Sequence, residues 1–290
     1  MSSKQIAVRD YASAEYAVLR ESDTVAHLRH LVVRTGQEMF PVVDDEERPI
    51  GSVSVKDIAW RMLLGGPEWR IRPIDGMLVG EFVQRNVKAV PADTPLQTAV
   101  RRLVESEADM LFVIEPEGGL LVFSYEEGLH AAADLLPESV LAREAMVAET
   151  PSVRPMHSIR RVIDVMNESS TKRVLVMDGD LLVGIITPRD VLMIEPYGPA
   201  AIRRRRFVRG RKYGRETGVS RGRRVLFVPI AIAEDVMSSP VISVKEDTPA
   251  RTVAQILAER HIGAVPVLDE RGKPIGFVTR ESLTRQLVGL

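Results

Sequence analysis

The residue pair best suited to chemistry in this chain is a hydroxyl followed three positions later by a carboxylate. A pattern of a small residue, two mostly apolar residues, Ser or Thr, two variable residues and Asp contains this pair as Ser54 with Asp57 and as Thr187 with Asp190. A hydroxyl can donate a hydrogen bond and an ionised carboxylate can only accept one, so the pair can hold a polar ligand. The same spacing is also an ordinary helix-capping arrangement, which a segment without a ligand would use equally well.

The pattern occurs twice more in weaker form. In Gly276-Phe-Val-Thr279-Arg-Glu-Ser282, serine stands in place of the aspartate. In Leu121-Val-Phe-Ser124-Tyr-Glu-Glu127, leucine stands in place of the small residue and glutamate in place of the aspartate. In the copy that contains Thr187, the basic residues Lys172 and Arg173 come directly before an apolar run. Numbering the copies along the chain, we therefore expect the third copy, which contains Thr187, to be the best ligand site, followed by the first copy, which contains Ser54. The fourth ranks lower and the second is expected to be empty.

No constellation of residues in the sequence predicts catalysis. The five His residues are scattered, and neither a Walker-type glycine loop nor a G-x-S-x-G motif occurs. Glu126 and Glu127 are adjacent, so on a helix they diverge and cannot form a facing carboxylate pair. Cysteine is absent, which excludes disulfides, thiolate metal sites and a cysteine nucleophile. We predict a protein that is not an enzyme, binds no metal and requires no cofactor.

The elements that must position these residues form a repeated unit, which is clearest at residues 240–282. A β-branched run at 241–244 predicts a strand, and Asp247 and Thr248 are cap-type residues before a helix with regularly spaced apolar positions. Two further apolar runs with a polar turn between them predict a hairpin, and a last helix is expected to start near Glu281.

The same β-α-β-β-α order fits three more segments, so we predict an α/β fold of four repeats. The four copies cover residues 16–63, 87–133, 152–194 and 240–282, and their related lead-ins begin at Val8, Val79, Arg143 and Glu234. The repeats resemble CBS domains, which pair into Bateman modules and often bind adenine nucleotides. We expect one module at residues 1–137, a second at 138–290, and a flexible basic insert at 195–230 within the second. The modules can close into a disk within one chain or pair across a homodimer, and the sequence leaves both arrangements open.

The resemblance implies that AMP, ADP or ATP is a regulatory ligand. In such modules the hydroxyl and the helix N-terminal amides donate to phosphate, and the carboxylate accepts from the ribose hydroxyls. Carried onto this sequence, the nucleotide-binding residues are Thr187, Asp190, Lys172, Arg173, Ser54, Asp57 and Thr279. His261 is the alternative candidate for a phosphate contact, but a histidine at a helix end is also favourable against the helix dipole.

The composition is that of a globular protein with a strong charge asymmetry. Of the 290 residues, 45% are hydrophobic and 27% charged, and no apolar run approaches the roughly 18 residues of a membrane span, so we expect a cytoplasmic location. Only two Asn residues occur, a bias compatible with a heat-adapted source. Residues 203–224 contain ten Arg and one Lys against Glu216, a net charge of +10; because the whole chain carries −1, the remainder carries −11.

The arginine-rich stretch predicts an RNA partner. Arginine side chains pair with phosphates and stack on bases, and aromatic rings stack on unpaired bases. The predicted RNA-binding residues are Arg203, Arg204, Arg205, Arg206, Phe207, Arg209, Arg211, Lys212, Tyr213, Arg215, Arg221, Arg223 and Arg224. A solvated loop, a strap docked on the acidic remainder of the chain and an anionic-membrane contact are the alternatives. Trp69, in the joint at 63–77, is expected to pack on the scaffold rather than to meet a partner.

Ribosomal RNA is the leading candidate partner. Arginine- and glycine-rich extensions of ribosomal proteins thread between RNA helices, and the chain resembles archaeal ribosome dormancy factors with four CBS repeats. The leading hypothesis is thus a hibernation factor that blocks ribosome function and reads adenine nucleotides. The main rival is a nucleotide sensor that regulates a protein partner, similar to the γ subunit of AMP-activated protein kinase. A DNA-binding regulator is a third hypothesis, although no helix-turn-helix signal is evident.

Overall fold

The computed structural model describes residues 5–64, 74–106, 108–117, 119–194, 205–207, 227–229 and 232–289. The prediction for Trp69 concerns a residue outside this part of the chain. The same holds for the RNA-binding predictions for Arg203, Arg204, Arg209, Arg211, Lys212, Tyr213, Arg215, Arg221, Arg223 and Arg224.

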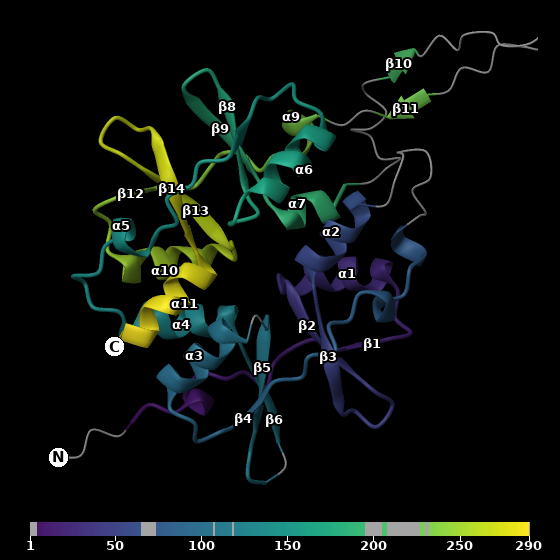
Figure 1. Ribbon diagram of the computed structural model, residues 1–290, viewed down its shortest axis with the longest axis vertical. Helices are drawn as coiled ribbons and strands as arrows, with labels where there is room; N and C mark the ends of the chain where they lie inside the picture. The colour runs from purple at the N-terminus through teal and green to yellow at the C-terminus, as the bar shows by residue number, and fades with distance from the viewer. Residues whose placement is uncertain are drawn as a thin grey trace, which may run out of the picture.

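The four predicted repeats are confirmed, and each contains a three-stranded sheet (Figure 1). The first repeat comprises β1 (Leu19–Arg20), α1 (Val25–Thr35), β2 (Met39–Val43), β3 (Pro49–Ser54) and α2 (Val55–Leu64). The second comprises β4 (Ala89–Pro91), α3 (Leu96–Glu105), β5 (Met110–Ile114), β6 (Leu120–Ser124) and α4 (Tyr125–Leu135). In both sheets the first strand is parallel to the second, and the second is antiparallel to the third.

The third and fourth repeats have the same strand order and directions. The third comprises β7 (Ser152–Val153), α6 (Ile159–Glu168), β8 (Val174–Asp178), β9 (Leu181–Ile186) and α7 (Pro188–Leu192). The fourth comprises β12 (Val244–Lys245), α10 (Ala250–Arg260), β13 (Ala264–Leu268), β14 (Pro274–Thr279) and α11 (Arg280–Gln286). Short lead-in helices precede the repeats: η1 (Val8–Asp10), η4 (Val79–Glu81), α5 (Ala142–Ala145) and α9 (Ala233–Val236).

Details of the fourth repeat differ from the sequence prediction. Its first strand begins at Val244 rather than at 241, and α11 begins at Arg280, one residue before the predicted start. Neither Asp247 nor Thr248 caps α10, because the helix begins at Ala250 and the N-cap position is occupied by Pro249, whose side chain has no acceptor. The Thr248 N–H donates to the Lys245 carbonyl in the preceding turn. His261 ends α10 in the left-handed region with a φ of 52°, as a helix terminus.

Each lead-in crosses to the other repeat of its half of the chain. Gln84 pairs with Ser52, and the corresponding crossings join Ser13 to Val122, Val147 to Phe277 and Ser238 to Ile185. The crossing explains the small residue of the motif, because a Cβ on Gly51 would lie 2.4 Å from the Gln84 carbonyl oxygen. A Cβ on Gly276 would similarly lie 2.6 Å from the Val147 carbonyl oxygen. The motif glycines therefore have a structural role that does not require a ligand.

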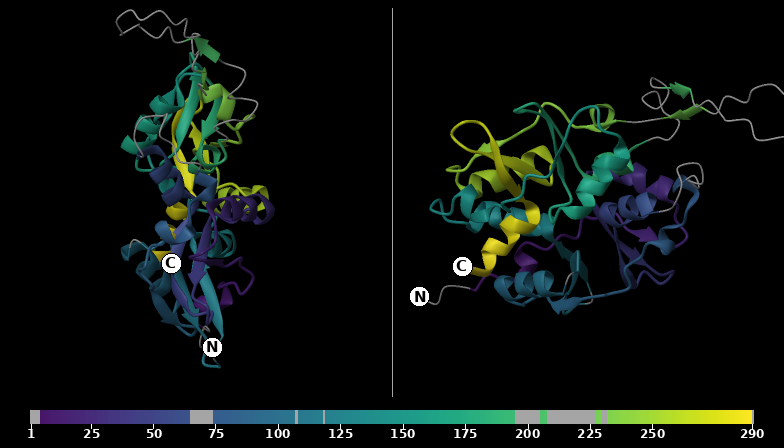
Figure 2. Two further views of the ribbon diagram at one scale, coloured as in Figure 1. Left: turned by 90° about the vertical axis from the view of Figure 1, so that its right-hand side faces the viewer. Right: turned by 45° about the horizontal axis from the view of Figure 1, so that its top comes forward.

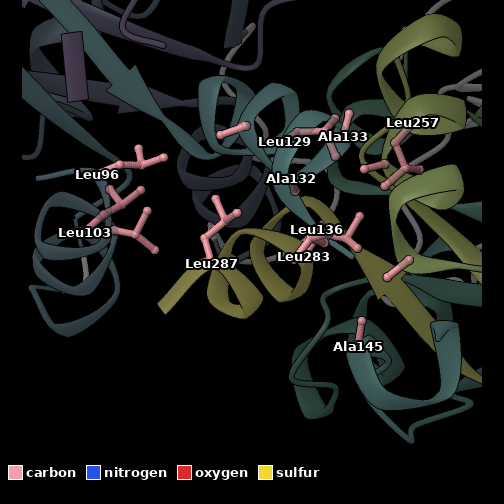
Figure 3. Close-up of a cluster of buried hydrophobic side chains, with 14 of the residues drawn as sticks. Leu96, Leu103, Leu129, Ala132, Ala133, Leu136, Ala145, Leu257, Leu283 and Leu287 are labelled. Carbon is pink, nitrogen blue, oxygen red and sulfur yellow. The ribbon is translucent and has the colours of Figure 1, made fainter. Parts of the chain in front are cut away.

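The repeats close into a flat disk within one chain (Figures 1 and 2). Within each half, a small apolar cluster lies between the two sheets, around Phe112 and Phe277 respectively. The larger cores cross between the halves, where α4 packs against α10 and α11, and α2 packs against α7. Figure 3 shows Leu136, directly after α4, beside Leu283 of α11, and Ala133 of α4 near Leu257 of α10. Helix packing between the halves thus brings the starts of the last helices toward the centre of the disk.

Two findings bear on the broad class of protein. Among the described residues, no helix is both long and apolar enough to cross a membrane. The same part of the chain contains no group of three or more His, Cys, Asp or Glu side chains arranged to hold a metal ion.

Candidate functional site

The hydroxyl and the carboxylate of the motif form a capping box at the start of the last helix. In the third repeat, Thr187 Oγ1 donates to Asp190 Oδ2 at 2.7 Å, and the Asp190 N–H donates back to Thr187 Oγ1 at 3.4 Å. In the first repeat, Ser54 Oγ donates to Asp57 Oδ2 at 2.6 Å. The capping interpretation of the motif is therefore confirmed in both complete copies, and ligand binding would have to share these groups.

The two weaker copies form the same box. Ser124 Oγ donates to Glu127 Oε2 at 2.5 Å, and the Ser282 N–H donates to Thr279 Oγ1 at 3.0 Å. Burial raises the pKa of the Glu127 carboxyl, despite the bonds from Ser124 that favour its charged form. Capping alone therefore does not distinguish the repeats that we expect to bind a ligand from those that we do not.

The third repeat has an additional contact that the sequence analysis missed. Ser238, in the lead-in that crosses from the fourth repeat, donates through Oγ to Asp190 Oδ1 at 2.9 Å. Asp190 of the third repeat is thus hydrogen-bonded to the lead-in of the fourth repeat, so a ligand that binds Asp190 would also affect the position of that lead-in.

The two basic residues before β8 have contacts of different kinds. Lys172 Nζ donates to the Asn167 carbonyl at 2.9 Å, at the end of the preceding helix. Arg173 donates to the Gly263 carbonyl at 3.3 Å and lies 3.7 Å from Glu281 Oε1. Arg173 therefore faces the fourth repeat, where it takes part in a larger group of charges.

That group, here called the charge hub, contains side chains from all four repeats. Arg280 of the fourth repeat lies 2.6 Å from Glu126 of the second and 3.7 Å from Glu38 of the first, measured from its NH1 atom to their Oε2 atoms. Arg173 of the third repeat pairs with Glu281 of the fourth. The hub thus comprises Glu38, Glu126, Arg173, Arg280 and Glu281. Within the described chain, the ion pairs of Arg280 are the ones that join the two halves.

Apart from Arg280, the first residue of α11, the hub residues occupy the same two positions of each repeat. The residues directly before the second strand are Glu38, Asp109, Arg173 and Gly263, and the second residues of the last helix are Lys56, Glu126, Arg189 and Glu281. Pairs between these positions form in both halves, as Lys56 with Asp109 at 3.1 Å and as Arg173 with Glu281. In the first half the other two positions are both acidic, and Arg280 supplies their counter-charge.

Three polar atoms of the hub are buried without a hydrogen-bond partner: Arg173 Nε, Arg280 Nε and Glu281 Oε2. The Arg280 residue is only 7% exposed. Gly263 lies against three residues of the hub. A Cβ at this position would be 3.2 Å from Arg173 NH2, 3.7 Å from Glu38 Oε2 and 3.9 Å from Arg280 Nε. Two buried guanidinium groups therefore each have a donor that a further acceptor could satisfy.

The hub also perturbs nearby titrations. Burial opposes ionisation of Glu281, but Arg173, the local backbone N–H, Thr279 and Arg280 together outweigh it and hold the pKa of this carboxyl below its usual value. Burial, together with the negative charge of Glu281, raises the pKa of Tyr125 to about 12. Glu281 thus remains ionised at neutral pH.

The insert leaves and rejoins the disk at the third repeat. It follows α7 and precedes α9, and Ile232 pairs with Ser158 at the start of α6. Near its base, β10 (Arg205–Phe207) and β11 (Phe227–Pro229) are antiparallel, with Phe207 opposite Phe227. The chain therefore enters and leaves residues 208–226 at adjacent points. Of the predicted RNA-binding residues, Arg205, Arg206 and Phe207 lie in β10.

Comparison with known proteins agrees with this architecture. The family model described as CBS domain matches residues 8–63, 79–121, 142–196 and 233–289. An uncharacterised 33.4 kDa protein in the ribosomal RNA operon of Thermofilum pendens is 25% identical over 93% of this chain and 87% of its own length. The crystal structure of protein MJ1225 from Methanocaldococcus jannaschii, a proposed archaeal homologue of g-AMPK, has a TM-score of 0.73 at 19% identity and covers 97% of this chain and 99% of its own. A conserved protein from Pyrococcus horikoshii has a TM-score of 0.62 at 17% identity, covering 98% and 100%.

Proposed function

Because this chain belongs to the CBS-domain family, we propose that it is a non-enzymatic regulatory protein that binds ribosomal RNA through its arginine-rich insert. Bound there, it blocks ribosome function by occupying an RNA surface that tRNA or mRNA needs. The observation that carries the proposal is the net charge of +10 at residues 203–224, on a chain whose remainder carries −11. Such a division favours contact with nucleic acid by the insert alone, because an acidic disk is repelled by phosphates.

The attachment of the insert supports this function. Its base is formed by the antiparallel pair β10 and β11, and the adjacent lead-in is anchored by the Ala233 N–H, which donates to the His157 carbonyl at 2.8 Å. Binding of RNA to the insert would therefore be transmitted to the third repeat through these backbone contacts. The Thermofilum pendens relative is described as lying in a ribosomal RNA operon, which is consistent with a link to the ribosome.

We further propose that the repeats bind adenine nucleotides as regulatory ligands. The third repeat is the first choice, with Thr187 toward phosphate and Asp190 toward ribose; the other proposed residues are Lys172, Arg173, Ser54, Asp57 and Thr279. Asp190 is already bonded to Ser238, whose lead-in follows the insert in the chain. A ligand that changes this bond would bias the position of the insert and thus ribosome binding. We propose that the two Bateman modules comprise residues 1–137 and 138–290.

A second function, regulation of a protein partner by adenine nucleotides, is favoured by the charge hub. Its ion pairs join all four repeats, so a ligand bound in one repeat could alter the surface of another. This alternative predicts nucleotide binding with little affinity for RNA, and a protein complex that survives nuclease treatment.

The proposal predicts that the purified protein inhibits translation by ribosomes of its source cell, and that a variant lacking residues 203–224 does not. Peptide synthesis from a defined mRNA is the measurement, at equal concentrations of the two proteins. The Arg101→Gln/Arg102→Gln variant is the control, because it removes two exposed charges of α3, far from the insert in sequence. Equal inhibition by the intact and shortened proteins would show that the insert is not the ribosome-blocking element.

A further inference from the structure

We infer that the charge hub selects ligands by charge: it admits a single phosphoryl group beside Arg173 and Arg280 and rejects polyphosphate chains. Glu38 and Glu126 are the residues that set this specificity. The inference deepens the proposed nucleotide binding and rests on it for the identity of the ligand. Its basis is the balance of charges in the hub.

The cations of the hub already have counter-ions. Arg280 pairs with Glu126 and Glu38, and Arg173 pairs with Glu281. Three carboxylates thus face two guanidinium groups, a surplus of one negative charge. The neighbouring Lys56 and Asp109 pair with each other and leave that surplus unchanged. A ligand with several negative charges would find no free positive charge among these residues. Arg189, at the corresponding position of the third repeat, donates to the Val32 carbonyl instead.

The hub nevertheless has donors for one acceptor. The Nε atoms of Arg173 and Arg280 are buried without a partner. A Cβ on Gly263 would lie 3.2 Å from Arg173 NH2, so an acceptor can enter this space only where a carboxylate leaves it. The carboxylate side chains of Glu126 and Glu38 are 34% and 28% exposed. Each can therefore turn toward water when an anion takes its place on Arg280. One phosphoryl group carries a charge of about −1.5 to −2 at pH 7, so when it replaces one carboxylate it increases the negative surplus of the hub by no more than about one charge.

A polyphosphate chain would add charge that nothing offsets. Two like charges at about 4 Å repel far more strongly in a partly buried site than in water, since the effective dielectric constant there is roughly 20 rather than 80. A second and third phosphate would lie near whichever of Glu38, Glu126 and Glu281 still faced the hub. The nucleotide class that fits is thus a nucleoside monophosphate, with its single phosphoryl group at the two Nε atoms.

Isothermal titration with adenosine, AMP and ATP, without added divalent cations, tests this specificity. For the intact protein we expect AMP to bind roughly tenfold or more tightly than ATP, since every ~1.4 kcal/mol of repulsion between the additional phosphates and the hub lowers the affinity tenfold. In the Glu38→Gln/Glu126→Gln variant the preference should shrink or reverse, because two of the repelling charges are gone. Glu117→Gln, on the exposed β5–β6 hairpin, is the matched control and should retain the preference. Equal binding of AMP and ATP to the intact protein, or an unchanged preference in the double variant, would overturn the inference.

A second measurement separates this inference from the nucleotide proposal. We expect millimolar tripolyphosphate to raise the melting temperature of the Glu38→Gln/Glu126→Gln variant by several degrees more than that of the intact protein, with inorganic phosphate stabilising the two proteins more nearly alike. If no adenosine compound binds any variant, nucleotide binding is refuted, and the tripolyphosphate comparison alone decides the charge selection. Identical tripolyphosphate shifts in the two proteins would contradict it.

Discussion

Raising the salt concentration from about 50 to 200 mM should weaken binding of this protein to ribosomal RNA by roughly 10³- to 10⁵-fold. That loss is expected when about 6 to 10 phosphates are contacted, because each contact releases condensed counter-ions and the gain from their release falls as salt rises. The eleven basic residues at 203–224 can supply this number of contacts. Filter binding with purified ribosomal RNA over a series of salt concentrations measures the slope.

Replacing five of the insert arginines by glutamine should make the slope shallower by roughly 3 to 5 units, since it falls by about 0.7 to 0.9 for each contact removed. The variant that changes Arg209, Arg211, Arg215, Arg221 and Arg223 leaves β10 and β11 intact. Changing the exposed pair Arg101 and Arg102 of α3 instead should leave the slope nearly as it is. A weak salt dependence of the intact protein would mean that the insert does not bind phosphates.

Replacing Arg280 by methionine should lower the free energy of unfolding by about 3 kcal/mol. Removing one partner of a buried ion pair commonly costs about 3 to 5 kcal/mol, and the partial exposure of Glu126 and Glu38 places this case at the lower end. The remaining carboxylates of the hub would repel one another across the junction of α4 and α11. Urea denaturation followed by circular dichroism measures the change.

The cause of that loss can be isolated by a second variant. Adding Glu38→Gln and Glu126→Gln to Arg280→Met should recover about 1 kcal/mol or more, because the unpaired charges are removed together with their counter-ion. Arg271→Met, on the exposed β13–β14 turn, should change stability by less than about 0.5 kcal/mol. If Arg280→Met is as stable as the intact protein, the hub does not hold the two halves together.

The fold was accessible from the sequence because the signals that specify it are local and repeated four times. Apolar runs on either side of a polar turn predicted the hairpin of β13 and β14, the apolar run after Lys172 and Arg173 is β8, and the pairs of a hydroxyl and a carboxylate marked the starts of the last helices. The first strands were harder to place: β12 is two residues long because only Val244 and Lys245 pair with β13, although the β-branched run begins at 241. Pairing between strands, rather than propensity, determined where that strand begins.

The candidate site was less accessible, because it depends on contacts between repeats. Ser238 reaches Asp190 only because the lead-in of one repeat crosses to another. Glu126 was considered only against its sequence neighbour, whereas its partner is Arg280, more than 150 positions away. Aligning the second residues of the last helices, which are Lys56, Glu126, Arg189 and Glu281, would have revealed that their charges alternate along the chain. It would not have revealed that Arg280 joins the two halves.

The central claim is that the insert attaches this protein to the ribosome. Sucrose-gradient sedimentation of the intact protein and of the variant lacking residues 203–224, each with ribosomes from the source cell at low salt, tests it most directly. We expect the intact protein to migrate with a ribosomal subunit or with whole ribosomes, and the shortened protein to stay at the top of the gradient. If the intact protein also stays at the top, or if both proteins migrate with ribosomes equally, the claim is wrong and regulation of a protein partner becomes the leading function.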